Sequence, residues 1–380
     1  MTTPAPSIGL ELRSLVTPDG ELELSLVESP LRVPAPTQVL VRVEAAPINP
    51  SDLGLLLAGA DPDAASIGGT AERPVVRIAL EDRAMRSLAG RVGKSLPVGN
   101  EGAGVVVSAG SDAASQALVG RAVALAGGAM YAEYRCVEAA QCLVLPEGTP
   151  PRLGASSFVN PMTTLGMIAT MRNEGHVALI HTAAASNLGQ MLVKLCVEEQ
   201  VALVNIVRSS EQEKLLRSIG AVHVCDSTTP TFMKDLIGAI GETGATVAFD
   251  AVGGGTLASQ ILTCMEAASV ASMTEYSRYG STTHKQVYIY GGLDTGPTVL
   301  TRGFGFAWGL SGWLVSSFLQ TVTPEEFQSL RQRVAAGLSS TFESTYTKEV
   351  TLAEALQPAA LAAYSKKATG EKYLVTPGRR

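Results

Sequence analysis

Histidine, cysteine and charge are all scarce in this chain. It has 380 residues, of which four are histidine and five cysteine, and only 17% are charged. The cysteines are odd in number, and no two are separated by the two-residue gap of zinc knuckles and redox motifs, so a disulfide framework is not expected. The first residues also lack the basic start and apolar run of a secretory signal. We expect reduced thiols, no metal and a cytoplasmic location.

An excess of basic residues is also missing. Lysine and arginine number 29 against 35 aspartates and glutamates, a net charge of -6, so no basic field attracts nucleic acid. Hydrophobic residues make up 46%, which excludes a disordered chain. One uncharged run, residues 303–324, is long enough to span a bilayer. Its glycine, serine and threonine favour a buried or interface strand and helix, so we expect no membrane partner.

The pattern of predicted strands and helices changes near residue 156. Before it, four β-rich segments indicate a barrel-like β domain: residues 38–45, 104–109, 119–125 and 134–145. After it, Asn160 and Pro161 predict a capped helix to residue 171. Strands and helices then alternate: strands at 177–182, 201–207, 222–225 and 246–250, and helices at 188–199, 211–219 and 232–240. This alternation predicts a parallel sheet covered by helices on both faces.

Two stretches fit neither pattern. Residues 59–96 and 267–286 resemble insertions. Loops of this length are usually functional or disordered. We therefore expect these segments to shape a binding pocket.

The turn after the first strand of the second half is built from small residues. Ala184, Ser186 and Gly189 keep the spacing of the G-x-G-x-x-G fingerprint. In a dinucleotide fold, this turn lets a pyrophosphate approach the N-terminus of the following helix. Small residues at a strand-to-helix turn also serve simple close packing, so the motif alone leaves both interpretations open.

The end of the next strand favours the first interpretation. NAD-binding folds usually have an acidic residue here, about 20 residues past the glycines, for the ribose hydroxyls. This chain has Arg208, Ser209 and Ser210, followed by Lys214. Cations and hydroxyls suit a 2′-phosphate, which predicts NADPH; the alternative is an exposed helix start with ordinary surface charge.

Several short motifs occur in an order and spacing that resemble a known superfamily. The main ones are Asn49-Pro50-Ser51-Asp52, Gly99-Asn100-Glu101-Gly102, Tyr131-Ala132-Glu133-Tyr134, Asn160-Pro161, Asp250-Ala251-Val252-Gly253-Gly254 and Tyr290-Gly291-Gly292. Together they resemble the medium-chain dehydrogenase/reductase superfamily, in its zinc-independent branch of NADPH:quinone oxidoreductases and 2-enoyl thioester reductases. The resemblance implies an α/β protein in which residues 1–155 and 320–380 form a GroES-like, β-rich catalytic domain. Residues 156–319 would form a doubly wound Rossmann domain that binds NADPH, with the cofactor in the cleft between the domains.

The resemblance also implies a set of cofactor-binding residues. Asn49 and Thr163 would flank the nicotinamide and orient the substrate. The other expected contacts are Ser186, Asn187 and Leu188 for the pyrophosphate, Arg208, Ser209 and Lys214 for the adenosine phosphate, and Val252, Tyr290, Gly291 and Gly292 for the rest of the groove.

Departures from the family's patterns bear on the chemistry. The cysteine and histidine ligands of the zinc-containing relatives are absent from this chain, which has Asn100 where those relatives have a histidine. We interpret the four histidines of this chain as strand-end or surface residues. Enoyl thioester reductases present a tyrosine in the loop that follows the Asn49 motif, but this chain has no tyrosine from Leu53 to Pro97. A substitute proton donor could come from Tyr276 or Tyr279. Arginines and lysines in the first insertion are interspersed with acids and indicate a solvated face rather than a CoA site.

The function expected from these observations is NADPH-dependent hydride transfer to a quinone or reactive enone. The alternatives are a 2-enoyl thioester reductase and a non-catalytic NADPH-binding protein with a redox-sensing or interaction role. A homodimer is also expected, because residues 286–290 and 303–319, with Trp308 and Trp313, carry much apolar surface.

Overall fold

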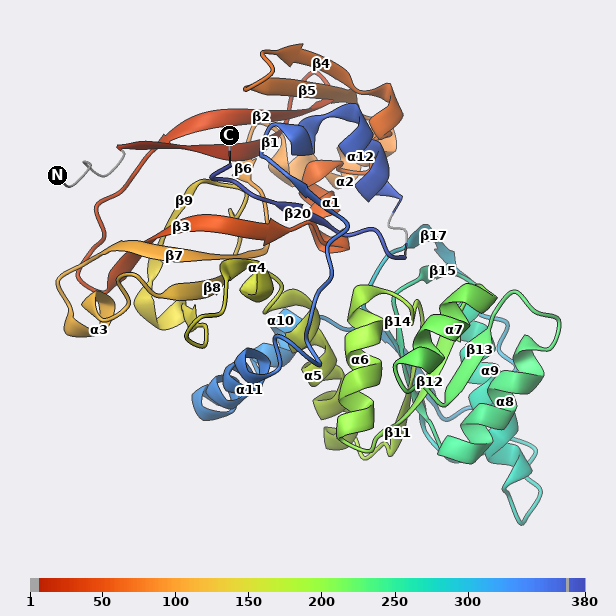
Figure 1. Ribbon diagram of the computed structural model, residues 1–380. Coiled ribbons are helices and arrows are strands. Elements are labelled where there is room, and N and C mark those ends of the chain that lie inside the picture. The colour runs from red at the N-terminus through yellow and green to blue at the C-terminus, as the bar shows by residue number, and fades with distance from the viewer. Residues whose placement is uncertain (1–6, 367–368, 380) are drawn as a thin grey trace. The chain divides into compact units, whose positions relative to one another are not determined.

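The chain folds into two compact units (Figure 1). The computed structural model describes residues 7–366 and 369–379. The first unit contains Met1–Val159 and Arg331–Arg380, and the second contains Asn160–Leu330. The sequence placed these boundaries at residues 155/156 and 319/320. Helix α11 (Pro324–Ala336) carries the chain back from the second unit to the first.

Two sheets enclose the core of the first unit. One has the strand order β4 (Ser66–Gly69), β5 (Pro74–Ala79), β2 (Glu21–Pro30), β1 (Ile8–Val16) and β6 (Ser95–Pro97). The other has the order β10 (Leu143–Val144), β8 (Ala122–Ala126), β7 (Glu101–Ala109), β3 (Gln38–Pro47), β20 (Tyr373–Val375) and β19 (Lys348–Val350), and β9 (Tyr134–Glu138) also pairs with β3. Alternate side chains of β2, such as Leu22 and Leu24, are buried in this core. The predicted β domain is confirmed.

Short helices fill the connections of this unit. They are α1 (Leu53–Leu56), α2 (Asp82–Ser87), α3 (Ala113–Gln116), α4 (Pro151–Gly154) and α12 (Pro358–Ser365). The first expected insertion is not simply a loop. Residues 74–79 form β5, which pairs with β2 from Glu21 to Ser25 and buries Val76 and Ile78 in the core.

The second unit is built on a parallel sheet. Its strand order is β13 (His223–Asp226), β12 (Ala202–Val207), β11 (Ala178–His181), β14 (Val247–Asp250), β16 (Lys285–Ile289) and β18 (Trp308–Gly312), and every pair is parallel. The connecting helices are α5 (Val159–Asn173), α6 (Asn187–Glu198), α7 (Ser210–Ser218), α8 (Phe232–Thr243) and α9 (Leu257–Ala271). Short elements complete the unit: β15 (Gly253–Gly255), β17 (Asp294–Thr298) and α10 (Val315–Leu319).

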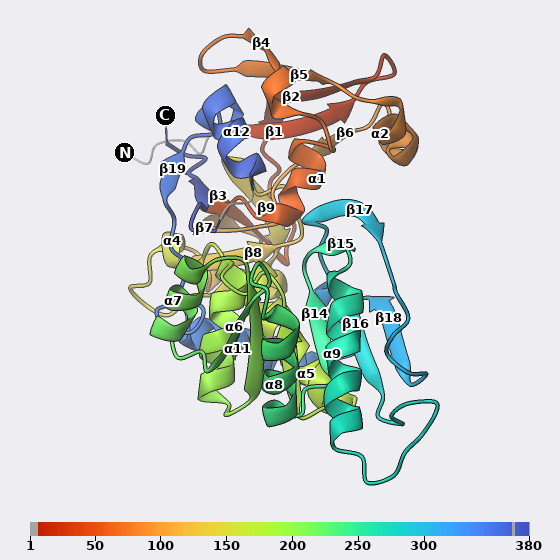
Figure 2. The ribbon, with the colours of Figure 1, turned by 90° about the vertical axis from the view of Figure 1, so that its right-hand side faces the viewer.

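Helices cover both faces of this sheet, as the sequence predicts. Helices α8 and α9 lie against one face (Figure 2), where Leu236 and Ile261 pack with Ile180 and Val204. Helix α6 lies on the opposite face (Figure 1). The uncharged run at residues 303–324 forms β18 and α10. Among the residues described, no helix is both long and apolar enough to cross a membrane.

The start of α5 differs from the prediction. The helix begins at Val159, so Asn160 lies inside its first turn and does not cap it. The amides of Phe158 and Val159 both donate to the Glu101 carboxylate, at 2.8 and 2.9 Å. A carboxylate from another element therefore satisfies the helix start. The Asn160 side chain donates instead to Asn187 Oδ1, at 2.8 Å.

Candidate functional site

The carboxyl ends of β11 and β14 mark the point where the chain's crossovers change direction. The chain runs from β11 to β12 and β13 on one side and then returns to β14 on the other. Ligands of open α/β sheets bind in the crevice that this reversal leaves. The turn after β11 and the turn after β14 therefore form the candidate site.

The turn after β11 is set by steric constraints. A Cβ on Gly189 would lie 2.1 Å from the Ala184 carbonyl oxygen, so only glycine lets α6 pack this closely on the turn. Ala183 has a φ of 51°, in the left-handed region that alanine rarely adopts. The Ser186 hydroxyl caps α6 by accepting from the Gly189 amide, at 3.1 Å. The helix N-terminus, with its outward amides and positive dipole end, is an anion site.

The turn after β14 is held by a buried carboxylate. Asp250 accepts hydrogen bonds from the Thr182 hydroxyl and from the amides of Val252 and Gly253, at 2.7, 2.9 and 3.1 Å. The Thr182 hydroxyl in turn accepts from the Ala251 amide. This network ties β11 to β14 and fixes Val252 beside the first turn.

His181 and Tyr290 join the ends of β11 and β16. His181 Nε2 lies 2.7 Å from the Tyr290 hydroxyl oxygen, and their rings stack. Burial lowers the pKa of His181 to about 3, so the imidazole is neutral. Burial, followed by the Asp250 charge, raises the pKa of Tyr290. His181 ends β11, in agreement with the interpretation of the histidines as strand-end or surface residues, and it is fully buried.

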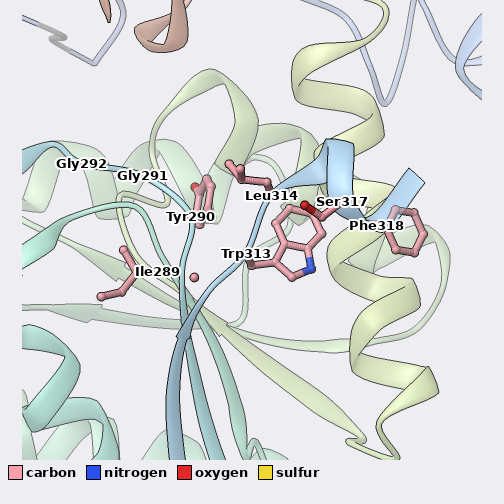
Figure 3. A pocket seen from close by; sticks show the side chains of 9 residues that line it. Ile289, Tyr290, Gly291, Gly292, Trp313, Leu314, Ser317 and Phe318 are labelled. Carbon is pink, nitrogen blue, oxygen red and sulfur yellow. The ribbon is translucent and has the colours of Figure 1, made fainter. Parts of the chain in front are cut away.

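Tyr290 lines a cavity of about 510 Å³ at the ends of β16 and β18. Figure 3 shows Tyr290, Trp313 and Leu314 close together there, with Ser317 and Phe318 on α10. The other lining residues are Ile289, Gly291, Gly292 and Gly312. A Cβ on Gly291 would lie 2.6 Å from the Ala251 carbonyl oxygen, so this strand end also requires glycine.

The expected phosphate contacts sit at the start of α7, and an acid stands beside them. Ser209 caps the helix, and the exposed Arg208 precedes it at the end of β12. Hydrogen bonds from the Glu211 backbone amide and then from the hydroxyls of Ser209 and Ser210 lower the pKa of Glu211, and Lys214 adds to the effect. Glu211, which was not among the residues expected at this strand end, therefore places a carboxylate next to Ser209 and Ser210.

The first unit holds a buried polar cluster that the motif analysis did not assign. Asn49 donates through Nδ2 to Glu101, at 2.9 Å, and its Oδ1 has no hydrogen-bond partner among the residues described. The Asp52 carboxylate accepts hydrogen bonds from the backbone amides of Asn49 and Asn100, at 2.8 and 2.9 Å. Burial raises the pKa of Asp52 to about 7 and raises that of Glu101. Burial lowers the pKa of Lys372 to about 8, against the charge of Glu101.

The structure therefore groups the expected site residues in three places. Ser186, Asn187, Leu188 and Val252 occupy the two turns; Arg208, Ser209 and Lys214 begin α7; and Tyr290, Gly291 and Gly292 line the cavity. Thr163 is buried on α5, and Asn49 belongs to the first unit. Tyr276 and Tyr279, the suggested donors, are 93% and 56% exposed on the loop between α9 and β16. The part of the chain described here has no group of three metal-ligating side chains.

Comparisons with known proteins agree with this architecture. Residues 35–147 match the alcohol dehydrogenase GroES-like domain. The rat (Rattus norvegicus) synaptic vesicle membrane protein VAT-1 homolog is 30% identical over 163 residues, 42% of this chain and 40% of the relative. Mouse (Mus musculus) prostaglandin reductase-3 is 33% identical over 141 residues, 35% of this chain and 36% of the relative. These matches span less than half of either relative.

A solved structure matches almost the whole chain. It is a candidate NADPH:quinone reductase from Mesorhizobium loti, 27% identical, with a TM-score of 0.71 over 99% of this chain and 100% of the other. Together with the GroES-like match and the parallel sheet described above, this likeness gives the relationship. The chain is thus similar to the medium-chain dehydrogenase/reductase superfamily, in the branch of the NADPH:quinone oxidoreductases and enoyl thioester reductases.

Proposed function

We propose that this protein is an NADPH-dependent oxidoreductase that reduces a small quinone or a reactive enone without a metal. The observation that carries the proposal is the β11–α6 turn, where Gly189 is forced against Ala184 and the helix N-terminus is left open to an anion. The residues present fit a dinucleotide, because a second glycine-dependent approach, at Gly291, occurs at the same edge of the sheet.

In this proposal the chain's residues bind and orient the reactants. The first turn of α6, with Ser186, Asn187 and Leu188, holds the pyrophosphate. Arg208, Ser209 and Lys214 face the 2′-phosphate, while Val252 and residues 290–292 line the groove. Asn49 and Thr163 remain the proposed neighbours of the nicotinamide. The buried, unpartnered Oδ1 of Asn49 supports that role, since an orphaned buried acceptor is available to a ligand's N–H or O–H.

Bound NADPH would supply the hydride, so the protein contributes orientation and exclusion of water. The aromatic cavity beside Tyr290 favours an uncharged acceptor, because none of its nine lining residues is charged. A reduced quinone is a hydroquinone anion that takes its proton from water. No buried acid has to deliver that proton, which matches the absence of a tyrosine from Leu53 to Pro97.

Steady-state oxidation of NADPH tests the proposal. We expect a higher kcat/KM with 1,4-naphthoquinone or a small enone than with crotonyl-CoA, and no loss of rate after treatment with a chelator. A higher kcat/KM with crotonyl-CoA would instead identify an enoyl thioester reductase. Tight NADPH binding without consumption across the panel would identify a non-catalytic binding protein, and stoichiometric zinc in the purified protein would contradict metal independence.

A further inference from the structure

The hydrogen bond between His181 and Tyr290 has a direction. The neutral imidazole carries one N–H, and His181 Nδ1 is buried with no hydrogen-bond partner among the residues described. Protonation at Nδ1 would leave a buried N–H without an acceptor. Such an orphaned donor is rarer in proteins than a buried acceptor nitrogen without a donor. The proton therefore belongs on Nε2, which donates to the Tyr290 oxygen at 2.7 Å. The hydroxyl hydrogen of Tyr290 is then left for another acceptor.

The cavity that Tyr290 lines limits what that acceptor can be. Its walls include the rings of Tyr290, Trp313 and Phe318, and its lining side chains carry only two hydroxyls, those of Tyr290 and Ser317 (Figure 3). The orientation of the Trp313 ring is fixed by two contacts. Its Nε1 donates a hydrogen bond to the Thr170 hydroxyl, and its ring packs edge-to-face with Phe249. Such a cavity suits a flat, uncharged ring with one polar atom.

We infer that Tyr290, its hydroxyl oriented by His181, donates a hydrogen bond to the carbonyl oxygen of a flat, uncharged acceptor in this cavity. The inference rests on the proposed function and names the residue that recognises the carbonyl group. Because the environment raises the pKa of Tyr290, the hydroxyl keeps its proton at neutral pH. It therefore stabilises negative charge that develops on the oxygen without transferring the proton.

The test compares Tyr290, which directly follows β16, with Tyr288 on that strand. Tyr290→Phe removes the proposed donor, whereas Tyr288→Phe removes a hydroxyl that bonds to Glu174 at 2.5 Å and does not line the cavity. We expect Tyr290→Phe to lower kcat/KM for 1,4-naphthoquinone about 100- to 1,000-fold, as the loss of one oxyanion-hole donor does. The dissociation constant for NADPH should change much less than kcat/KM does, and the pH profile should show no tyrosine ionisation. Tyr288→Phe should behave as the unmodified protein.

A second measurement needs no turnover. The chain has two tryptophans, so a Trp308→Phe background leaves Trp313 as the reporter. Quenching of its fluorescence by 1,4-naphthoquinone, without NADPH, should give a dissociation constant that Tyr290→Phe raises by up to about tenfold, the value of one hydrogen bond. Ser317→Ala removes the second hydroxyl of the cavity and so tests whether that hydroxyl, rather than Tyr290, holds the carbonyl; it is informative even where Tyr290→Phe is unstable.

Three results would overturn the inference: Tyr290→Phe matching Tyr288→Phe in both readouts, Ser317→Ala carrying the loss instead, or a weakening of NADPH binding equal to the loss of activity. The last would place the hydroxyl against the cofactor. Failure of the unmodified protein to oxidise NADPH with any acceptor would instead reject the proposed function, and the quenching measurement would still decide whether Tyr290 contacts the carbonyl.

Discussion

A methyl group at residue 189 has no room, since its carbon would lie 2.1 Å from a backbone oxygen. We expect Gly189→Ala to push α6 away from the turn and to destabilise the second unit by about 1–3 kcal/mol. The dissociation constant for NADPH should rise with it. Chemical denaturation and NADPH fluorescence titration check both effects.

The matched control for this change is Gly238→Ala. Gly238 is an exposed glycine inside α8, and a Cβ there would contact nothing within 4 Å. Alanine should therefore leave cofactor binding intact and stabilise the helix by about 0.5–1 kcal/mol. Equal effects of the two substitutions would contradict the steric argument.

Asp52 should make stability depend on pH in an unusual direction. Its pKa rises from 3.8 to about 7, chiefly through burial, so the folded chain holds a proton that the unfolded chain has released. The contribution of Asp52 is fully present below its unfolded pKa and is lost as pH rises toward about 7. Asp52→Asn should flatten this fall. It should also cost about 1–3 kcal/mol, because an amide cannot accept both backbone N–H groups.

Urea denaturation from acidic to neutral pH measures this dependence. Exposed Asp82 offers the control Asp82→Asn, which should follow the unmodified protein. A free energy of unfolding that rises over this window because of Asp52 would contradict the raised pKa. Glu101, whose pKa is also raised, should preserve part of the slope in Asp52→Asn.

At the scale of elements, the start of α7 should control cofactor preference. We expect Arg208→Glu to raise the dissociation constant for NADPH far more than that for NADH, since guanidinium–phosphate pairs are strong. Glu211→Gln should do the opposite and tighten NADPH binding by roughly three- to tenfold, because it removes a repelling charge and releases the two serine hydroxyls.

Glu213→Gln is the control on the same helix, because Glu213 already pairs with Arg217 at 2.8 Å. Both charge effects should weaken as salt is added. Equal affinity of the unmodified protein for NADPH and NADH would contradict the assignment of Arg208.

Elements with a local signal could be predicted from the sequence. The parallel strands and the helices from α6 to α8 follow from apolar periodicity, and their bounds fall close to those expected. The start of α5 could not be predicted, because the carboxylate that caps it belongs to Glu101, which is more than 50 residues away in the sequence. Strand β5 could not be predicted for the same reason. Its six residues form a strand by pairing with β2, which is distant in the sequence. The turn motif could be recognised in the sequence. The His181–Tyr290 pair could not, because the two residues are 109 positions apart.

At the scale of the whole molecule, the expected homodimer stays a prediction, but the two tryptophans no longer support it. Both tryptophans are packed within the second unit, Trp308 against Phe304 and Trp313 against Phe249. What remains is β18: in the part of the chain that the structure describes, it is the last strand of its sheet, and we expect its outer edge to pair with a second copy. We expect light scattering to report a dimer.

Gly312→Lys should then shift the chain to a monomer, because charged lysines on edge strands oppose pairing. Gly312 is exposed, and a Cβ there would lie 3.9 Å from its nearest neighbour, so the change is tolerated locally. Gly241→Lys, at an exposed and open position of α8, should leave the mass unchanged. A monomeric unmodified protein would reject the dimer.

The order of the two units along the chain has a consequence for synthesis on the ribosome. The second unit ends at Leu330, whereas β20, which pairs with β3 in the first unit, begins at Tyr373. Because translation is slow relative to the folding of a domain, the nucleotide-binding unit can fold first. The first unit has to leave Ala46 and Pro47, the end of β3 that pairs with β20, unpaired until residues 373–375 are made, whereas β9 can already pair with residues 38–42. Until β20 pairs with it, this unpaired end of β3 is open to aggregation.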